Sequence, residues 1–109
     1  MGGTKGASEG GLITAGDVAA HLLRSCGSLE DFDAYMFGSA LREVGEDIDI
    51  LVVGPGGSAL AQLKRELQAA GEQLPLHILY MLPSEERRTD FIARQGCVPL
   101  ERLLIAAAG

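Results

Sequence analysis

Three apolar segments of the chain have the composition and length of β-strands. Aromatic and β-branched residues are frequent in the first two, and a Gly or Pro follows each segment. Successive side chains on a strand point to opposite faces, so Ile48, Ile50 and Val52 are expected together on one buried face. The expected strands run from Phe32 to Phe37, from Asp47 to Val53 and from Leu74 to Leu82.

Apolar residues at helical spacing predict the helices. The first begins at Thr14, where Thr14 and Asp17 fit a capping box, and it stops at Gly27. The second runs from Ser58, its expected N-cap, to Ala70. Residues three or four positions apart are expected to face the core, namely Val18, Leu22 and Cys26 in the first helix and Leu60, Leu63 and Leu67 in the second.

The end of the chain is expected to be helical as well. Pro83 and Ser84 start a third helix, with Ser84 as its N-cap, and Gly96 ends it. A last short helix has Pro99 in its first turn, and a helical turn over residues 40–43 follows the first strand. Together these elements predict an α/β (α+β) fold, in which a small mixed sheet of three or four strands has its helices packed mainly on one face.

Composition limits the partners of this chain. We expect a flexible, glycine-rich tail over residues 1–11 and a single domain over residues 12–109. A net charge of −6 argues against binding bare nucleic acid, because no basic patch offsets the phosphates. No apolar run approaches the length of a membrane span. Cys26 and Cys97 have no metal or redox spacing, and they fit a reducing compartment, so a cytoplasmic protein is expected.

Two carboxylates open the second strand and give the candidate site. Asp47 and Asp49 are two residues apart, so their side chains are expected on one face. Adjacent carboxylates repel each other and need a cation, and Mg²⁺ prefers oxygen ligands. After the first strand, Gly38 lets a phosphate approach the backbone, and Ser39 offers a hydroxyl and N–H groups to an anion. A phosphate cradle beside metal-binding carboxylates is typical of nucleotidyl and phosphoryl transfer.

The order Gly-Ser, a short connector, Asp-x-Asp and then aliphatic residues resembles the signature of the nucleotidyltransferase superfamily, whose fold is shared with the palm of DNA polymerase beta. The similarity covers about residues 31–100 and is greatest to small stand-alone bacterial nucleotidyltransferase domains. It implies that Gly38 and Ser39 hold the phosphates of an NTP, with ATP as the first candidate, and that Asp47 and Asp49 bind Mg²⁺. The implied reaction transfers an NMP group to a hydroxyl acceptor.

Arg42 is a further candidate for the nucleotide site. It lies three residues after Ser39 and on the same side of the expected helical turn, so it can reach a phosphate. The alternative is a surface arginine that pairs with Glu43 or Glu46.

Two features depart from the family pattern. The connector between Ser39 and Asp47 has seven residues, fewer than is usual in the family. The family carries a third carboxylate on the following strand, and His77 aligns with that position. His77 has several interpretations: a general base, a ligand of Mn²⁺ in place of Mg²⁺, an ion-pair partner of Asp47 or Asp49, or a sign that catalysis has been lost.

Two other functions remain open. A non-catalytic protein on the same fold would resemble the antitoxin partners of helical RNase toxins, and the acidic charge and small size fit such a protein partner or a homo-oligomer. Gly54, Gly56 and Ala59 also match a dinucleotide-binding fingerprint. That fold buries its first strand on both faces, so Asp47 and Asp49 would be misplaced in it. A plain turn before the second helix is favoured.

Overall fold

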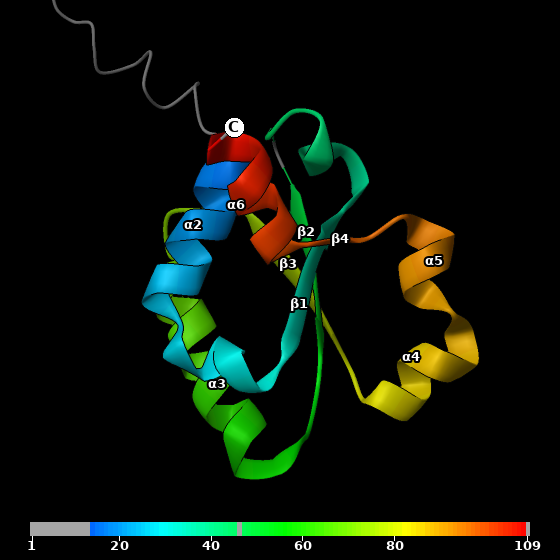
Figure 1. Ribbon diagram of the computed structural model, residues 1–109. Coiled ribbons are helices and arrows are strands. Elements are labelled where there is room, and N and C mark those ends of the chain that lie inside the picture. Colours follow the sequence, from blue (N-terminus) through cyan, green and yellow to red (C-terminus); the bar gives the residue numbers. More distant parts are fainter. Residues whose placement is uncertain (1–13, 46, 109) are drawn as a thin grey trace, which may run out of the picture.

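A four-stranded mixed sheet forms the centre of the computed structural model, which describes residues 14–45 and 47–108 (Figure 1). The strands are β1 (Asp33–Phe37), β2 (Ile48–Val53), β3 (Leu76–Met81) and β4 (Val98–Pro99), in the spatial order β3-β2-β1-β4. β1 is antiparallel to both β2 and β4, whereas β2 and β3 are parallel. A parallel pair needs a crossover, and α3 (Gly57–Ala70) provides it. The α/β fold with a mixed sheet is therefore confirmed.

Helices lie on both sides of this sheet, with the longer ones on one face. α2 (Ala15–Ser25), α3 and α6 (Leu100–Ala108) cover that face, and α4 (Pro83–Thr89) and α5 (Phe91–Gln95) lie beyond the other (Figure 1). The core fills the space under the three longer helices. Its fully buried side chains include Val18, Leu22, Cys26, Met36, Ile48, Ile50, Val52, Leu63, Leu67 and Leu100.

The first helix starts as the sequence predicts but continues differently. The Thr14 hydroxyl accepts from Asp17 N at 3.1 Å, and the Asp17 carboxylate accepts from Thr14 N at 3.0 Å, so the capping box is confirmed. Gly27 is not a simple stop, because it begins a 3₁₀ helix, η1 (Gly27–Asp31). Glu66 of α3 holds η1 by accepting hydrogen bonds from Ser28 N at 2.9 Å and Ser28 Oγ at 2.8 Å. A contact between residues so distant in the chain leaves no local signal.

Two expected N-caps are wrong. α3 has Gly56 as its N-cap and begins at Gly57, whose φ of +71° favours glycine, so Ser58 lies inside the helix. The third helix begins at Pro83 with Leu82 as its N-cap, so Ser84 also lies inside. In both cases the chain enters the helix one or two residues before the polar side chain, and backbone geometry at Gly or Pro sets the start.

The expected third helix is in fact two helices. Asp90 adopts a left-handed conformation, with φ of 53°, and separates α4 from α5. The Glu86 carboxylate spans this break by accepting from Ile92 N at 3.0 Å, which satisfies a free N–H at the start of α5. Gly96 ends α5, as the sequence predicts.

The last strand corrects the interpretation of Pro99. Pro99 pairs with Tyr35 across β1 and β4, and α6 begins only at Leu100. A two-residue strand has too few positions to show alternation, so the sequence pattern misses it. The expected tail over residues 1–11 lies outside the described residues.

Candidate active site

The candidate site lies where β1 ends and β2 begins. Phe37, the last residue of β1, is the register partner of Asp49 on the antiparallel strand β2. This pairing brings the chain at Gly38, which follows Phe37, beside the carboxylate of Asp49. Asp47 is exposed and Asp49 is half-buried. Ile48, between them, is fully buried on the opposite face, so the two carboxylates lie on one face as the alternation predicts.

Gly38 is in close contact with Asp49. Its φ is +79°, and a Cβ placed on it would lie 2.7 Å from Oδ2 of Asp49. The left-handed backbone conformation favours glycine at this position, and a larger residue would also have to displace the Asp49 carboxylate. The Asp49 carboxylate therefore lies directly beside the exposed backbone at Gly38.

Ser39 and Arg42 lie on the short turn that follows. The turn is a 3₁₀ helix, η2 (Gly38–Leu41), which starts two residues earlier than the sequence predicts. Ala40 is buried and anchors it, whereas Ser39 and Arg42 are exposed. Ser39 O accepts from Arg42 N at 3.0 Å, so both residues belong to one tight turn beside Asp49. The alternative pairing of Arg42 with Glu46 concerns a residue outside the described ones.

His77 joins the same face from β3. It is the register partner of Asp49 on the parallel strand, and its Nε2 lies 2.9 Å from Oδ1 of Asp47. Both side chains are largely exposed, at 63% for His77 and 59% for Asp47. Exposed ion pairs stabilise a fold only weakly, so this contact orients Asp47 more than it holds the sheet together.

The carboxylates on this face can supply some, but not all, of the ligands of a divalent metal. Among the described residues, no group of three or more His, Cys, Asp or Glu side chains is arranged to hold a metal ion. Mg²⁺ in nucleotide sites commonly uses only one or two carboxylates and completes its shell with water and substrate phosphates. Asp47 and Asp49 can supply that pair, and the exposed residues Gly38 and Ser39 follow the strand position that pairs with Asp49.

An aromatic pair borders the site, and the sequence did not predict it. The ring of Phe91 in α5 packs edge-to-face on Phe37, with centroids 5.2 Å apart and an interplanar angle of 87°. This contact ties α5 to the face that carries Asp49, next to the end of β1. Nothing in the local sequence pattern links Phe37 and Phe91, which are far apart in the chain.

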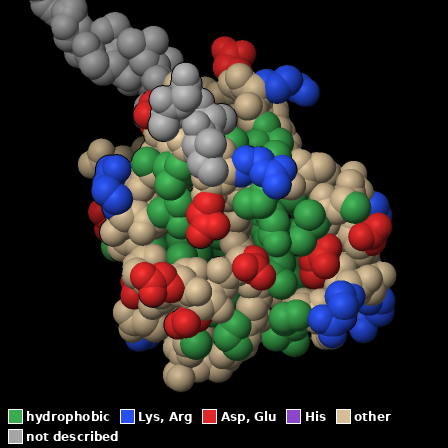
Figure 2. All heavy atoms as spheres, in the orientation of Figure 1, with side chains coloured by type: hydrophobic (Ala, Val, Ile, Leu, Met, Phe, Trp, Pro, Cys, Tyr) green, Lys and Arg blue, Asp and Glu red, His purple; other side chains and the backbone are tan. Residues whose placement is uncertain are grey.

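Figure 2 shows acidic side chains around exposed hydrophobic ones on the side of the molecule that faces the viewer.

A family model for the nucleotidyltransferase domain matches residues 20–96. The matched segment covers more than half of the chain and contains β1, β2, β3 and all the candidate site residues. The chain belongs to the nucleotidyltransferase domain family. Comparisons with curated proteins and with solved structures found no significant match.

Membership of the nucleotidyltransferase family supports nucleotidyl transfer as the general function and a nucleotide as the substrate. Domains of this family generally use divalent metals. Within the described part of the chain, no helix is both long enough and apolar enough to cross a membrane.

In this nucleotidyltransferase domain, the glycine at the start of the loop between β2 and α3 has a structural explanation. A Cβ on Gly54 would clash with the ring of Phe32, so Gly54 is required for packing. The small cavity beside it, of about 110 Å³, is lined mostly by apolar side chains and includes the carboxylate-bearing Glu85. A carboxylate there would repel a pyrophosphate group, which argues against the dinucleotide-binding interpretation.

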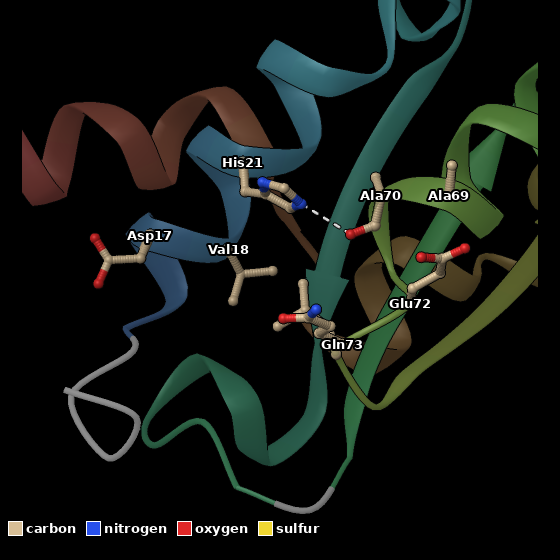
Figure 3. Close-up of a pocket in the computed structure, with 8 residues that line it drawn as sticks. Asp17, Val18, His21, Ala69, Ala70, Glu72 and Gln73 are labelled. Carbon is tan, nitrogen blue, oxygen red and sulfur yellow. Dashed lines mark hydrogen bonds between the residues drawn. The ribbon is translucent and has the colours of Figure 1, made fainter. Parts of the chain in front are cut away.

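A second hollow lies between α2 and the end of α3 (Figure 3). It has a volume of about 440 Å³, and its lining contains none of the predicted site residues. His21 from α2 points across it, and its Nε2 lies 2.8 Å from the carbonyl oxygen of Ala70. His21 therefore joins two helices, which explains it as a structural residue.

Proposed function

We propose that this nucleotidyltransferase domain binds an NTP with a divalent metal at Gly38, Ser39, Asp47 and Asp49, and transfers an NMP group to a hydroxyl acceptor. The close approach of the Gly38 backbone to the Asp49 carboxylate supports the proposal, because it brings the residue expected to approach a phosphate next to one expected to bind the metal. ATP is the first candidate for the NTP. The free thiols Cys26 and Cys97 are in keeping with the reducing cytoplasm as the place of this activity.

Each residue of the proposed site has a separate role. Ser39 is exposed at the start of η2, where its hydroxyl and the N–H groups of the turn can donate to phosphate oxygens. Arg42 adds a positive charge one turn later. Asp47 and Asp49 would hold the metal, with His77 orienting Asp47. When bound, Mg²⁺ or Mn²⁺ would neutralise charge on the phosphates during the displacement of pyrophosphate.

A second function rests on His77. Its Nε2 is in contact with Asp47, at the place where the family has a third carboxylate, so one metal ligand is already paired and another is replaced. This arrangement favours a catalytically impaired nucleotidyltransferase-fold protein that works as an interaction partner. Such a chain would act like the antitoxin partner of a helical RNase toxin.

Nucleotide binding tests the proposed site directly. We expect ATP to bind in the presence of Mg²⁺ or Mn²⁺ in a calorimetric titration, and Asp49→Asn to weaken binding by about tenfold or more. Asp33→Asn is the matched control, because Asp33 is exposed on the same face at the other end of β1, about 13 Å away at strand spacing. Equal effects of the two substitutions, or no ATP binding with either metal, would contradict the site.

Pyrophosphate release separates the two functions. We expect the wild-type chain to release pyrophosphate from ATP when hydroxyl acceptors are supplied, and Asp49→Asn to abolish the release. A chain that binds ATP with the metal but releases no pyrophosphate with any acceptor would favour the interaction protein.

A further inference from the structure

The outer edge of β3 has no strand beside it among the described residues. The inner side of β3 faces β2. There the carbonyl oxygen of Pro75 accepts from Ile48 N at 2.9 Å, and the carbonyl oxygen of Met81 accepts from N of Gly54, directly after β2, at 3.1 Å. Backbone groups of alternate residues point to opposite edges of a strand. Ile78 and Tyr80 therefore direct their N–H and C=O groups outward.

This edge lacks the features that usually prevent strand pairing. The segment from Leu76 to Met81 contains no Asp, Glu, Lys or Arg. Within the described part of the chain, the exposed large hydrophobic side chains are Leu79 of β3, at 39%, and Leu82, directly after β3, at 45%. Natural proteins commonly protect a free edge with charges, bulges or a covering segment. An apolar, uncharged edge is typical of a pairing surface.

A groove of about 450 Å³ runs beside the same edge, between β3 and α3. Opposite charges mark its two ends. At one end, Nζ of Lys64 lies 4.9 Å from the ring centroid of Tyr80. At the other end, Glu72 follows Gly71, which packs directly against Leu76.

We propose that β3 pairs antiparallel with β3 of a second copy of this chain, around a two-fold axis at Leu79. This register places Ile78 opposite Tyr80 of the second copy, and both residues have outward N–H and C=O groups to exchange. A register centred on Ile78 is less suitable, since it would need Leu76 N, which already donates to Leu74 O at 2.8 Å. The Leu79 register also joins an aromatic to a β-branched side chain, a favourable cross-strand pair.

Charge identifies the occupant as a second copy. A two-fold axis makes the grooves of the two copies run in opposite directions. Lys64 of each copy is therefore brought toward Glu72 of the other copy, which gives two such charge pairs. The paired strands contain no Asp, Glu, Lys or Arg, so no like charges lie directly opposite each other across the pair. The surface is therefore complementary to itself.

Charge reversal tests the pairing. Because a short interface gives a weak dimer, the wild-type chain should be measured by sedimentation equilibrium at concentrations on the order of 100 µM. We expect the mass of a dimer, twice the chain mass of 11.4 kDa. Lys64→Glu and Glu72→Lys should each raise the dissociation constant about tenfold, and the double variant should restore it. Arg65→Glu, an equal charge change at an exposed position of the same helix outside the groove, should have no effect.

Several results would overturn the proposal. A wild-type chain that remains at 11.4 kDa would do so, and the edge would then be left to a partner of another kind. A dimer that Lys64→Glu, Glu72→Lys and Arg65→Glu weaken equally, or that the double variant does not restore, would place the interface elsewhere.

A disulfide tests the register independently. Residues opposite each other in a non-hydrogen-bonded pair have Cα atoms about 4.5 Å apart, within the range of a disulfide. In a Cys97→Ser background, Leu79→Cys should form a covalent dimer under mild oxidation. Met81→Cys on the same face is the control, because its two copies would lie about 13 Å apart in this register. No cross-link at position 79, or equal cross-linking at 79 and 81, would contradict the Leu79 axis.

Discussion

The backbone at Gly38 lies so close to the carboxylate of Asp49 that any side chain at position 38 would have to displace this carboxylate. A Cβ there would lie 2.7 Å from Oδ2 of Asp49, and the φ of +79° disfavours any L residue. The two residues come from the two strands of one hairpin, where Phe37 and Asp49 are register partners. Position 38 therefore reports directly on the proposed nucleotide site.

Gly38→Ala should damage both the site and the fold. The left-handed conformation alone costs about 1–2 kcal/mol for a residue with a Cβ, and the methyl group would displace the Asp49 carboxylate. We expect ATP binding to weaken about tenfold or more, measured by calorimetry, and the urea midpoint to fall. Gly45→Ala is the control, because a Cβ at Gly45 meets no atom within 4 Å. Equal loss of binding in both variants would argue against the contact.

A carboxylate at position 77 should improve the metal site. His77 is the register partner of Asp49, so His77→Asp would place a third carboxylate on the face that carries Asp47 and Asp49. Carboxylate oxygen suits Mg²⁺ better than imidazole nitrogen does. We expect Mg²⁺-dependent ATP binding to strengthen about tenfold in a titration. His77→Asn removes the imidazole without adding charge, and stronger binding by that variant would contradict the prediction.

The core under α3 should be sensitive at Leu63. Its side chain is fully buried between α3 and the sheet, at 0% exposure, whereas Leu60 is only half-buried. Leu63→Ala should lower the free energy of unfolding by about 2–5 kcal/mol, because it leaves a cavity. Leu60→Ala should cost clearly less. Urea denaturation of both variants measures the difference, and an equal cost would contradict the packing.

The contact between α3 and η1 should depend on pH. Hydrogen bonds from the Gln62 side chain, and then from Ser28, lower the pKa of Glu66. The folded pKa is below the unfolded one, so these bonds stabilise the fold above the unfolded value of about 4.3. Their contribution is lost as pH falls through the folded pKa.

Glu66→Gln should therefore be less stable than wild type at pH 7, and the difference should shrink in acid. Thermal melts between neutral and acidic pH measure it, with Glu43→Gln at an exposed position as the control. A difference between Glu66→Gln and wild type that is independent of pH would show that the carboxylate charge is not involved.

Local patterns were sufficient to predict most of the sheet. The aliphatic run from Ile48 to Val53 gave β2, which is buried at every position except Asp49, and the aromatic residues ahead of Gly38 gave β1. β4 escaped because two residues, Val98 and Pro99, cannot show a period. The break at Asp90 escaped because a left-handed residue that is not glycine has no strong sequence signal.

The sequence predicted which residues form the candidate site, but not how they lie relative to one another. The Asp-x-Asp spacing placed Asp47 and Asp49 on one face, and the Gly-Ser pair pointed to a phosphate position. The approach of Gly38 to Asp49 depends on hairpin register, and the Phe37–Phe91 contact depends on how α5 folds back. Both are long-range consequences of the fold, which spacing alone does not encode.

Strand pairing, rather than the connector, sets the distance between Gly38 and Asp49. A flexible connector contributes little to that distance, since doubling the length of a loop costs only about 0.6 kcal/mol. The exposed connector residues Glu43 and Gly45 can therefore change while the pairing of Phe37 with Asp49 stays fixed. In evolutionary terms, the hairpin constrains Gly38 and Asp49 as a pair, whereas the exposed connector positions can vary independently of them.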